Sequence, residues 1–192
     1  MNQRADWQFG ELRMFGYRLV VADPPWDFAN YSDAGTKKGA DPHYSVMCLD
    51  AIKALRVGEL IRGDGLLLLW STGCMLPQCL EVMNAWGFVY KSEIIWRKVF
   101  PSGKLRMGTG YRVRTMHEPV LLGTIGNPKH KPFPSIFDGI AREHSRKPDA
   151  FYQLLDEFAP EFQGERADLF SRQHRQGWDG WGDEVGKFAS AA

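Results

Sequence analysis

A short stretch of unusual composition, Asp23-Pro24-Pro25-Trp26, directly follows the apolar segment YRLVVA (17–22). A carboxylate accepts hydrogen bonds, and a proline lacks a backbone donor but keeps its carbonyl acceptor. Asp23 and the carbonyl of Pro24 could therefore converge on one amine. Trp26 offers a flat face for a base, a contact worth about 1–3 kcal/mol. This describes a pocket for a planar ring with an exocyclic amine, although a proline-rich turn with a capping aspartate and a core tryptophan explains the four residues equally well.

The segments around this stretch predict the elements that must position it. Five apolar runs read as strands, at residues 17–22, 66–71, 88–96, 118–124 and 166–170. Helices are expected after Asp50, over residues 76–87, and after Pro148, where Phe151, Leu154, Leu155 and Phe158 recur at helical spacing. Near-continuous apolar strands between helices predict an α/β fold, a mostly parallel sheet with helices on both faces. Ligands of such folds bind beyond the carboxyl ends of the strands, where Asp23 is expected.

The composition is that of an ordinary globular domain. The 192 residues suit a single domain, 1–192, with a flexible tail from about 186. Hydrophobic residues make up 44% and charged residues 24%, with no apolar run of membrane-spanning length. The polar N-terminus lacks the apolar core of a signal peptide, so we expect a cytoplasmic protein. The spacing of Cys48, Cys74 and Cys79 fits neither a disulfide framework nor a zinc site, which predicts reduced thiols.

Three segments are too long and irregular for simple connections, at residues 27–43, 97–114 and 126–147. The middle one contains six basic residues and no acidic one, although the net charge of the chain is only +1. Beside a pocket for a base, such a loop is expected to contact phosphates, although loops are often charged in any case. The candidates for nucleic-acid binding are Lys98, Lys104, Arg106, Arg112 and Arg114.

Seven motifs together resemble one known family. They are ADPPWDF (22–28), HYSVM (43–47), GLLLLWSTG (65–73), SEIIWRK (92–98), HEPVLLGTIGNP (117–128), SRKPDAFY (145–152) and ADLFSRQHRQGWDGWGDE (167–184). The chain resembles the N6-adenine methyltransferases that include the catalytic subunit of the eukaryotic mRNA adenosine methyltransferase, with bacterial and phage relatives. The resemblance implies a single Rossmann-like domain that uses S-adenosylmethionine, permuted so that the catalytic motif precedes the cofactor motif.

The resemblance also implies the reaction, methyl transfer from S-adenosylmethionine to the exocyclic nitrogen of adenine. Asp23 and the carbonyl of Pro24 would accept hydrogen bonds from that amine and aim its lone pair at the methyl group. Pro25 completes the motif, Trp26 would pack against the adenine, and Tyr44 would line the pocket. A base within a duplex would first have to flip out, at a cost of a few kcal/mol.

For the cofactor, the resemblance implies a site built late in the chain. Lys147 matches a cofactor-contacting lysine of the family. The other implied cofactor residues are Ala22, Asp23, Asp168, Phe170, Ser171, Arg172, His174, Asp183 and Glu184. Gln173 stands where the eukaryotic pattern has Pro, and Arg175 where it has Asn. The histidines lack metal-ligand spacing, so no metal is expected.

Two alternatives to adenine methylation are retained. A catalytically silent relative that binds nucleic acid or a partner chain would have an altered tetrapeptide in this family, whereas DPPW is intact here. Methylation of cytosine N4 would present a similar amine, but motifs of that class usually begin with Ser rather than Asp. Nucleic acid is the expected partner, with DNA preferred to RNA; membrane association is not expected, and the oligomeric state, a homodimer included, stays open.

Overall fold

The computed structural model describes residues 6–26, 46–109, 112–143 and 146–188, and within them seven strands form one sheet. The strands are β1 (Tyr17–Ala22), β2 (Ile61–Trp70), β3 (Val89–Val99), β4 (His117–Ile125), β5 (Ile136–Ile140), β6 (Arg166–Leu169) and β7 (Asp179–Trp181). Their order across the sheet is β5-β3-β4-β2-β1-β6-β7. The pairs β1–β2, β1–β6, β3–β5 and β6–β7 are parallel, whereas β4 runs antiparallel to β2 and to β3. The predicted α/β fold with a mostly parallel sheet is confirmed.

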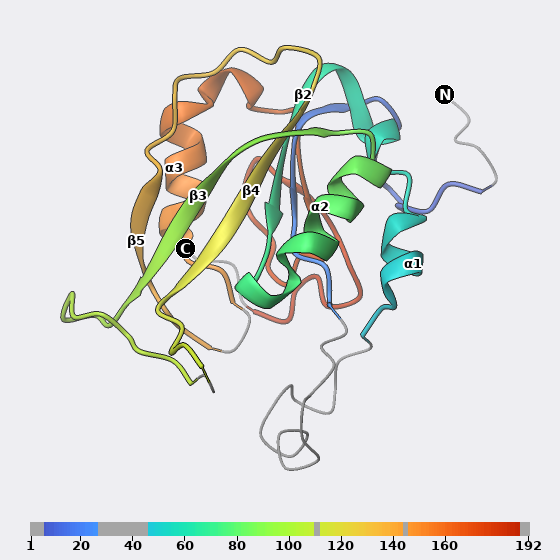
Figure 1. The fold of residues 1–192 in the computed structure, drawn as a ribbon. Coiled ribbons are helices and arrows are strands. Elements are labelled where there is room, and N and C mark those ends of the chain that lie inside the picture. The colour runs from blue at the N-terminus through green and yellow to red at the C-terminus, as the bar shows by residue number, and fades with distance from the viewer. Residues whose placement is uncertain (1–5, 27–45, 110–111, 144–145, 189–192) are drawn as a thin grey trace.

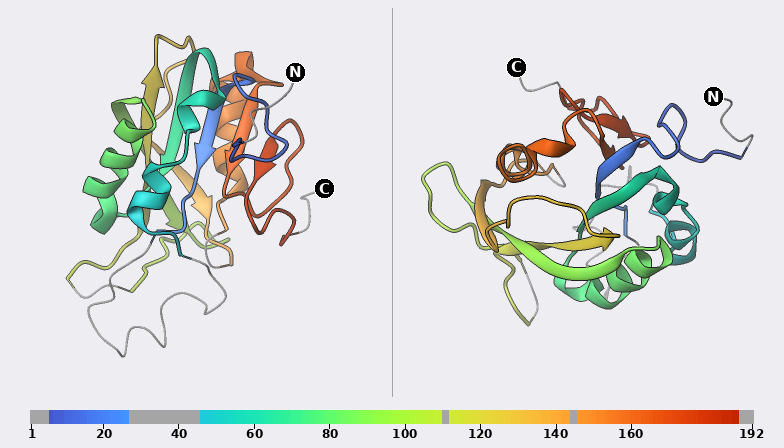
Figure 2. Two further views of the ribbon diagram at one scale, coloured as in Figure 1. Left: turned by 90° about the vertical axis from the view of Figure 1, so that its right-hand side faces the viewer. Right: turned by 90° about the horizontal axis from the view of Figure 1, so that it is seen from above.

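Helices cover both faces of the sheet, as predicted. Helices α1 (Leu49–Lys53) and α2 (Leu76–Ala85) lie on one face, and α3 (Asp149–Phe158) lies on the other (Figures 1 and 2). Short 3-10 turns occupy Val57–Leu60, Gly73–Met75 and Pro160–Phe162. Among the described residues, no helix is long and apolar enough to cross a membrane.

The two cores explain why the central strands are apolar without interruption. Val20 and Leu67 are buried in the cluster that includes residues of α1 and α2, whereas Val21 and Leu68 are buried in the cluster that includes residues of α3. Successive side chains of a strand point to opposite faces, so a strand that is covered twice must be apolar at every position.

The sheet is larger than the sequence predicted. Strand β5 lies within the segment 126–147 that was expected to be irregular, and β7 was not predicted at all. Strand β3 continues beyond its predicted end at Trp96 to Val99, because its last five residues pair with β5. Both added strands are short edge strands, and Ile136 and Ile140 of β5 are exposed, so neither shows the apolar signature of a buried strand.

The topology brings five chain segments to one edge of the sheet. Strands β1, β2 and β6 are parallel and end there, and β4 begins there because it runs in the opposite direction. Gly139 lets the start of α3 approach β3 and β5, since a Cβ at this position would lie 2.5 Å from the indole nitrogen of Trp96 and 2.8 Å from Cβ of Pro148. Lys147, which precedes Pro148, is thereby held at the same edge.

Candidate active site

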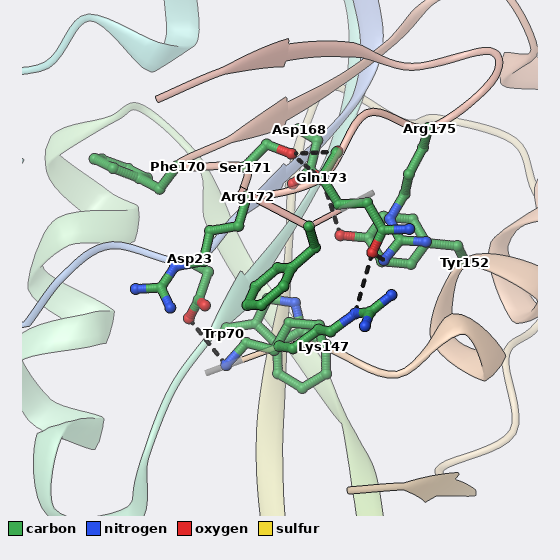
Figure 3. A pocket seen from close by; sticks show the side chains of 12 residues that line it. Asp23, Trp70, Lys147, Tyr152, Asp168, Phe170, Ser171, Arg172, Gln173 and Arg175 are labelled. Carbon is green, nitrogen blue, oxygen red and sulfur yellow. Dashed lines mark hydrogen bonds and ion pairs between the residues drawn. The ribbon is translucent and has the colours of Figure 1, made fainter. Parts of the chain in front are cut away.

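A pocket opens at this edge, beyond the carboxyl ends of β1 and β6 (Figure 3). Six residues that the sequence nominated line it together, namely Asp23, Lys147, Asp168, Phe170, Ser171 and Arg172. Six other lining residues were not nominated as site residues, namely Trp70, Arg146, Tyr152, Gln173, Arg175 and Phe188, although Gln173 and Arg175 were noted as departures from the eukaryotic pattern. Residues from opposite ends of the chain thus form one site because β1 pairs with β6.

Lys147 lies between two carboxylates. Its ammonium nitrogen is 3.1 Å from Oδ1 of Asp23 and 3.1 Å from Oε2 of Glu118, and it also lies 4.6 Å from the ring centroid of Trp70. Desolvation lowers the pKa of Lys147, but the charges of Asp23 and Glu118 outweigh it and leave that pKa above its ordinary value. Lys147 is therefore a cation at neutral pH, fixed at the wall of the pocket.

The pKa values of Asp23 and Glu118 are shifted in opposite directions, although Lys147 lowers both. Desolvation raises the pKa of Asp23, and the attraction of Lys147 only partly offsets it. Desolvation also acts on Glu118, but Lys147 and Lys98 together hold the pKa of Glu118 below its ordinary value. Of the two, Asp23 is the stronger proton acceptor.

Glu118 is a site residue that the sequence reasoning missed. It stands at the start of β4, and its carboxylate accepts hydrogen bonds from Lys98 at 2.5 Å and from Lys147 at 3.1 Å. The motif that contains Glu118 was noted only as part of the resemblance. Nothing local distinguishes this acid, because its position depends on β4 being antiparallel to β2.

The tetrapeptide itself is tightly folded. The Asp23 amide donates to the carbonyl of Leu169 in β6 at 3.3 Å, which ties the two strand ends together. The Trp26 amide donates to the carbonyl of Pro24 at 2.9 Å, and the Met47 amide donates to that of Pro25 at 3.1 Å. A carbonyl oxygen has two lone pairs, so Pro24 keeps one acceptor site for a ligand.

Trp26 is 5% exposed and packs in the apolar cluster that includes residues of α1 and α2. In the structure it is thus a core residue, and its contact with a base stays a prediction. Pro24 is buried and Pro25 is half-buried beside it. Tyr44 lies outside the described residues.

Asp168 supplies the acid on the opposite wall. Its Oδ2 accepts hydrogen bonds from the hydroxyl groups of Tyr152 at 2.9 Å and of Ser171 at 3.2 Å. Burial raises the pKa of Asp168 to about 6, although both hydrogen bonds and the charge of Arg175 act to lower it. Asp168 is therefore mostly charged at pH 7 and titrates in the mildly acidic range.

The backbone after β6 is strained where it enters the pocket. Phe170 adopts a positive φ of 61°, which is uncommon for a bulky residue. Gly182 packs directly against it, and a Cβ on Gly182 would lie 2.9 Å from Cα of Phe170. Strain of this kind concentrates at functional sites, consistent with the place of Phe170 in the pocket.

The remaining nominated cofactor residues divide into two groups. Glu184 does not line the pocket but lies 3.2 Å from the guanidinium of Arg172, which does. Desolvation lowers the pKa of Arg172, although Glu184 and Asp23 oppose it. Ala22 is buried within β1, while His174 and Asp183 are exposed, and these three are not among the lining residues. Their contacts with a cofactor stay predictions.

Phe188 brings the end of the described chain back to the pocket. Its amide donates to the carbonyl of Arg172 at 3.0 Å, and its ring lines the pocket beneath the guanidinium of Arg146, 5.0 Å from the ring centroid. The sequence assigned residues from about 186 onward to a flexible tail. In the structure, Phe188 forms part of the pocket wall.

The basic candidates for nucleic-acid binding lie between β3 and β4 or at the end of β3. Arg106 donates to the carbonyl of Ala141 at 2.7 Å, and Lys98 is paired with Glu118, so both have structural partners. Lys104, Arg112 and Arg114 are exposed. Contact of all five residues with nucleic acid stays a prediction.

Comparison with known proteins places the chain in a family. Residues 17–184 match MT-A70, a span from the start of β1 to beyond β7 that includes most of the pocket. The chain belongs to the MT-A70 family. The resemblance inferred from the seven motifs is thereby confirmed.

Three MT-A70 relatives differ greatly in length. The N(6)-adenosine-methyltransferase MT-A70-like of Arabidopsis thaliana is 31% identical over 193 residues, 94% of this chain and 26% of the plant protein. The human N(6)-adenosine-methyltransferase catalytic subunit METTL3 is 29% identical over 175 residues, 88% of this chain and 28% of METTL3. The Type II methyltransferase M.MunI of Mycoplasma sp is 26% identical over 197 residues, 94% of this chain and 82% of M.MunI. The chain thus spans about a quarter of the plant and human relatives and most of the mycoplasmal one.

Proposed function

We propose that this protein transfers a methyl group from S-adenosylmethionine to N6 of adenine in nucleic acid. The observation that carries the proposal is the position of Asp23. The end of β1 presents this first residue of DPPW to a pocket, 3.1 Å from Lys147, and β6 supplies Asp168 to the same pocket. The names of the plant and human MT-A70 relatives support adenosine N6 as the acceptor.

The chemistry of the pocket fits S-adenosylmethionine. The cofactor combines a carboxylate, an ammonium, a ribose diol and an adenine ring. The pocket offers the cations Lys147 and Arg172, the anions Asp23 and Asp168, and the aromatic ring of Phe170. Gln173 also lines it, and its buried amide nitrogen has no hydrogen-bond partner among the described residues. A buried donor without a partner is costly, so a ligand acceptor would satisfy it.

In the proposed reaction, bound S-adenosylmethionine supplies an electrophilic methyl group. Asp23 and the remaining lone pair of the Pro24 carbonyl accept hydrogen bonds from the two N–H groups of the adenine amine, which orients the nitrogen lone pair. When the nitrogen–methyl bond forms and the sulfur–methyl bond breaks, S-adenosylhomocysteine would be left and the amine would lose one proton, which Asp23 is placed to accept. The charge of Lys147 lowers the pKa of Asp23 and so favours its ionised form against desolvation. The raised pKa of Asp23 makes its carboxylate the stronger acceptor for the amine protons.

We propose DNA rather than RNA as the preferred nucleic-acid substrate. The support is that one MT-A70 relative, M.MunI, is named a Type II methyltransferase, whereas the plant and human relatives are named adenosine methyltransferases.

The test replaces Asp23. Asp23→Ala should lower the initial rate of methylation at least 100-fold, whereas calorimetry should show that S-adenosylhomocysteine still binds. Asp50→Asn is the matched control, because the Asp50 side chain is 94% exposed and remote from the pocket. Near-wild-type methylation by Asp23→Ala would refute the role of Asp23.

A further inference from the structure

At the wall of the pocket, Tyr152 of α3 reaches Asp168 of β6. The Tyr152 ring is buried, and its hydroxyl donates to Oδ2 of Asp168 at 2.9 Å. Ser171 donates to the same oxygen at 3.2 Å. The side-chain hydrogen bonds that Asp168 accepts among the described residues both go to Oδ2. Tyr152 of α3 thus fixes the side chain of Asp168, which belongs to β6.

Arg175 holds Tyr152 from the other side. Its guanidinium carbon lies 3.7 Å from the centroid of the Tyr152 ring, and its NH1 donates to Asp149 at 2.8 Å. Arg142 donates to both oxygens of Asp149, at 2.8 and 2.9 Å, so this carboxylate is itself fixed. A guanidinium stacked on a ring and bound to a fixed carboxylate has little freedom to turn.

We propose that Tyr152 and Arg175 are positioning residues that fix the Asp168 carboxylate at the wall of the pocket and favour its ionised form. A hydroxyl that donates to a carboxylate favours its charged form, and so does a nearby cation. Both effects act against burial, which raises the pKa of Asp168. Asp23 also acts on Asp168, and its charge raises the pKa of Asp168.

The assignment rests on the proposed function, in that the pocket takes S-adenosylmethionine. An ionised Asp168 can accept hydrogen bonds from ribose hydroxyls or from an ammonium, which a protonated carboxyl does less well. Arg175 stands where the eukaryotic pattern has Asn, so this chain would have replaced a small amide with a residue that acts on the ligand through Tyr152.

The experiment measures the Asp168 carboxyl directly. In the protein without ligand, carboxyl carbon NMR follows its titration, and the resonance is identified by its loss in Asp168→Asn. Tyr152→Phe should raise the pKa of Asp168 by about one unit, because only the hydroxyl is removed. Arg175→Gln should raise the pKa of Asp168 as well. With Arg175→Lys, which keeps a positive charge, the pKa of Asp168 should lie between those of the wild type and Arg175→Gln. Trp178→Phe is the control, since Trp178 packs edge-on against Tyr152 at 5.4 Å and is not a hydrogen-bond partner of Asp168.

Calorimetry with S-adenosylhomocysteine then tests the effect on binding. At pH 6.5, Tyr152→Phe should bind about threefold more weakly than the wild type, and at pH 8.5 the difference should disappear because Asp168 is ionised in both. An unchanged pKa, or a loss of affinity that is equal at both pH values, would overturn the claim that Tyr152 acts by keeping Asp168 ionised. If the wild type failed to bind S-adenosylhomocysteine, the proposed function would fall, while the NMR titration would still decide what Tyr152 does.

Discussion

Asp168→Asn should show how much the ionised Asp168 carboxylate lowers the free energy of unfolding. The pKa of Asp168 is about 6 in the folded protein against an ordinary value of 3.8. A pKa that folding raises adds stability while the carboxyl is protonated, and this contribution is lost as the pH rises through the folded pKa. At 1.36 kcal/mol per unit, the ionised carboxylate costs the folded state about 3 kcal/mol at pH 7.5.

The variant removes the titration but keeps an oxygen that can accept from Tyr152 and Ser171. Its new amide hydrogens need partners, which costs about 1–3 kcal/mol at every pH. The pH dependence is therefore the diagnostic quantity. Relative to the wild type, the free energy of unfolding of Asp168→Asn should fall by about 1.4 kcal/mol between pH 7.5 and pH 5.

Urea unfolding of both proteins at the two pH values measures this difference, and the unfolding should be reversible for the comparison to hold. Asp50→Asn serves as the control, because the Asp50 side chain is exposed and does not line the pocket. If the difference in the free energy of unfolding between Asp168→Asn and the wild type were the same at pH 7.5 and pH 5, folding would not raise the pKa of Asp168.

Three further changes test other parts of the site. Glu118→Gln should lower the free energy of unfolding by about 1–2 kcal/mol at pH 7, because Lys98 and Lys147 lose a shared partner. Since the pKa of Glu118 is depressed in the folded state, this deficit in urea unfolding should shrink as the pH falls through that pKa. A chain that ends at residue 187 should bind S-adenosylhomocysteine about fivefold more weakly in calorimetry than one that ends at 188, because the ring of Phe188 is lost from the pocket. Gly139→Ala should lower the free energy of unfolding by about 1–3 kcal/mol, and the melting temperature with it, since the Cβ of the alanine would collide with Trp96.

The end of β1 was predictable because its signals are local. An apolar run that stops at Asp23 and two prolines indicates a strand end, and in an α/β fold a strand end is where ligands bind. Lys147 and Asp168 were found only through the family resemblance. By itself, a lysine in a basic loop gives no sign that it will be buried between two carboxylates.

Other features depend on tertiary structure and could not be predicted. Glu118 reaches the site only because β4 runs against β2, and no local pattern determines that direction. Strand β5 and the extension of β3 form because they pair with each other, although Ile136 and Ile140 at the edge are exposed. Phe188 lies in a segment of small and polar residues, and its place in the pocket comes from its backbone contact with Arg172.

The identity of the methylated nucleoside tests the central claim most directly. The protein is incubated with methyl-labelled S-adenosylmethionine and matched single- and double-stranded DNA and RNA, and the products are digested to nucleosides and separated. The proposed chemistry at Asp23 predicts label in N6-methyladenine, with more in DNA than in RNA, and none with Asp23→Ala. Label in N4-methylcytosine, or no label in any of the four substrates, would contradict it.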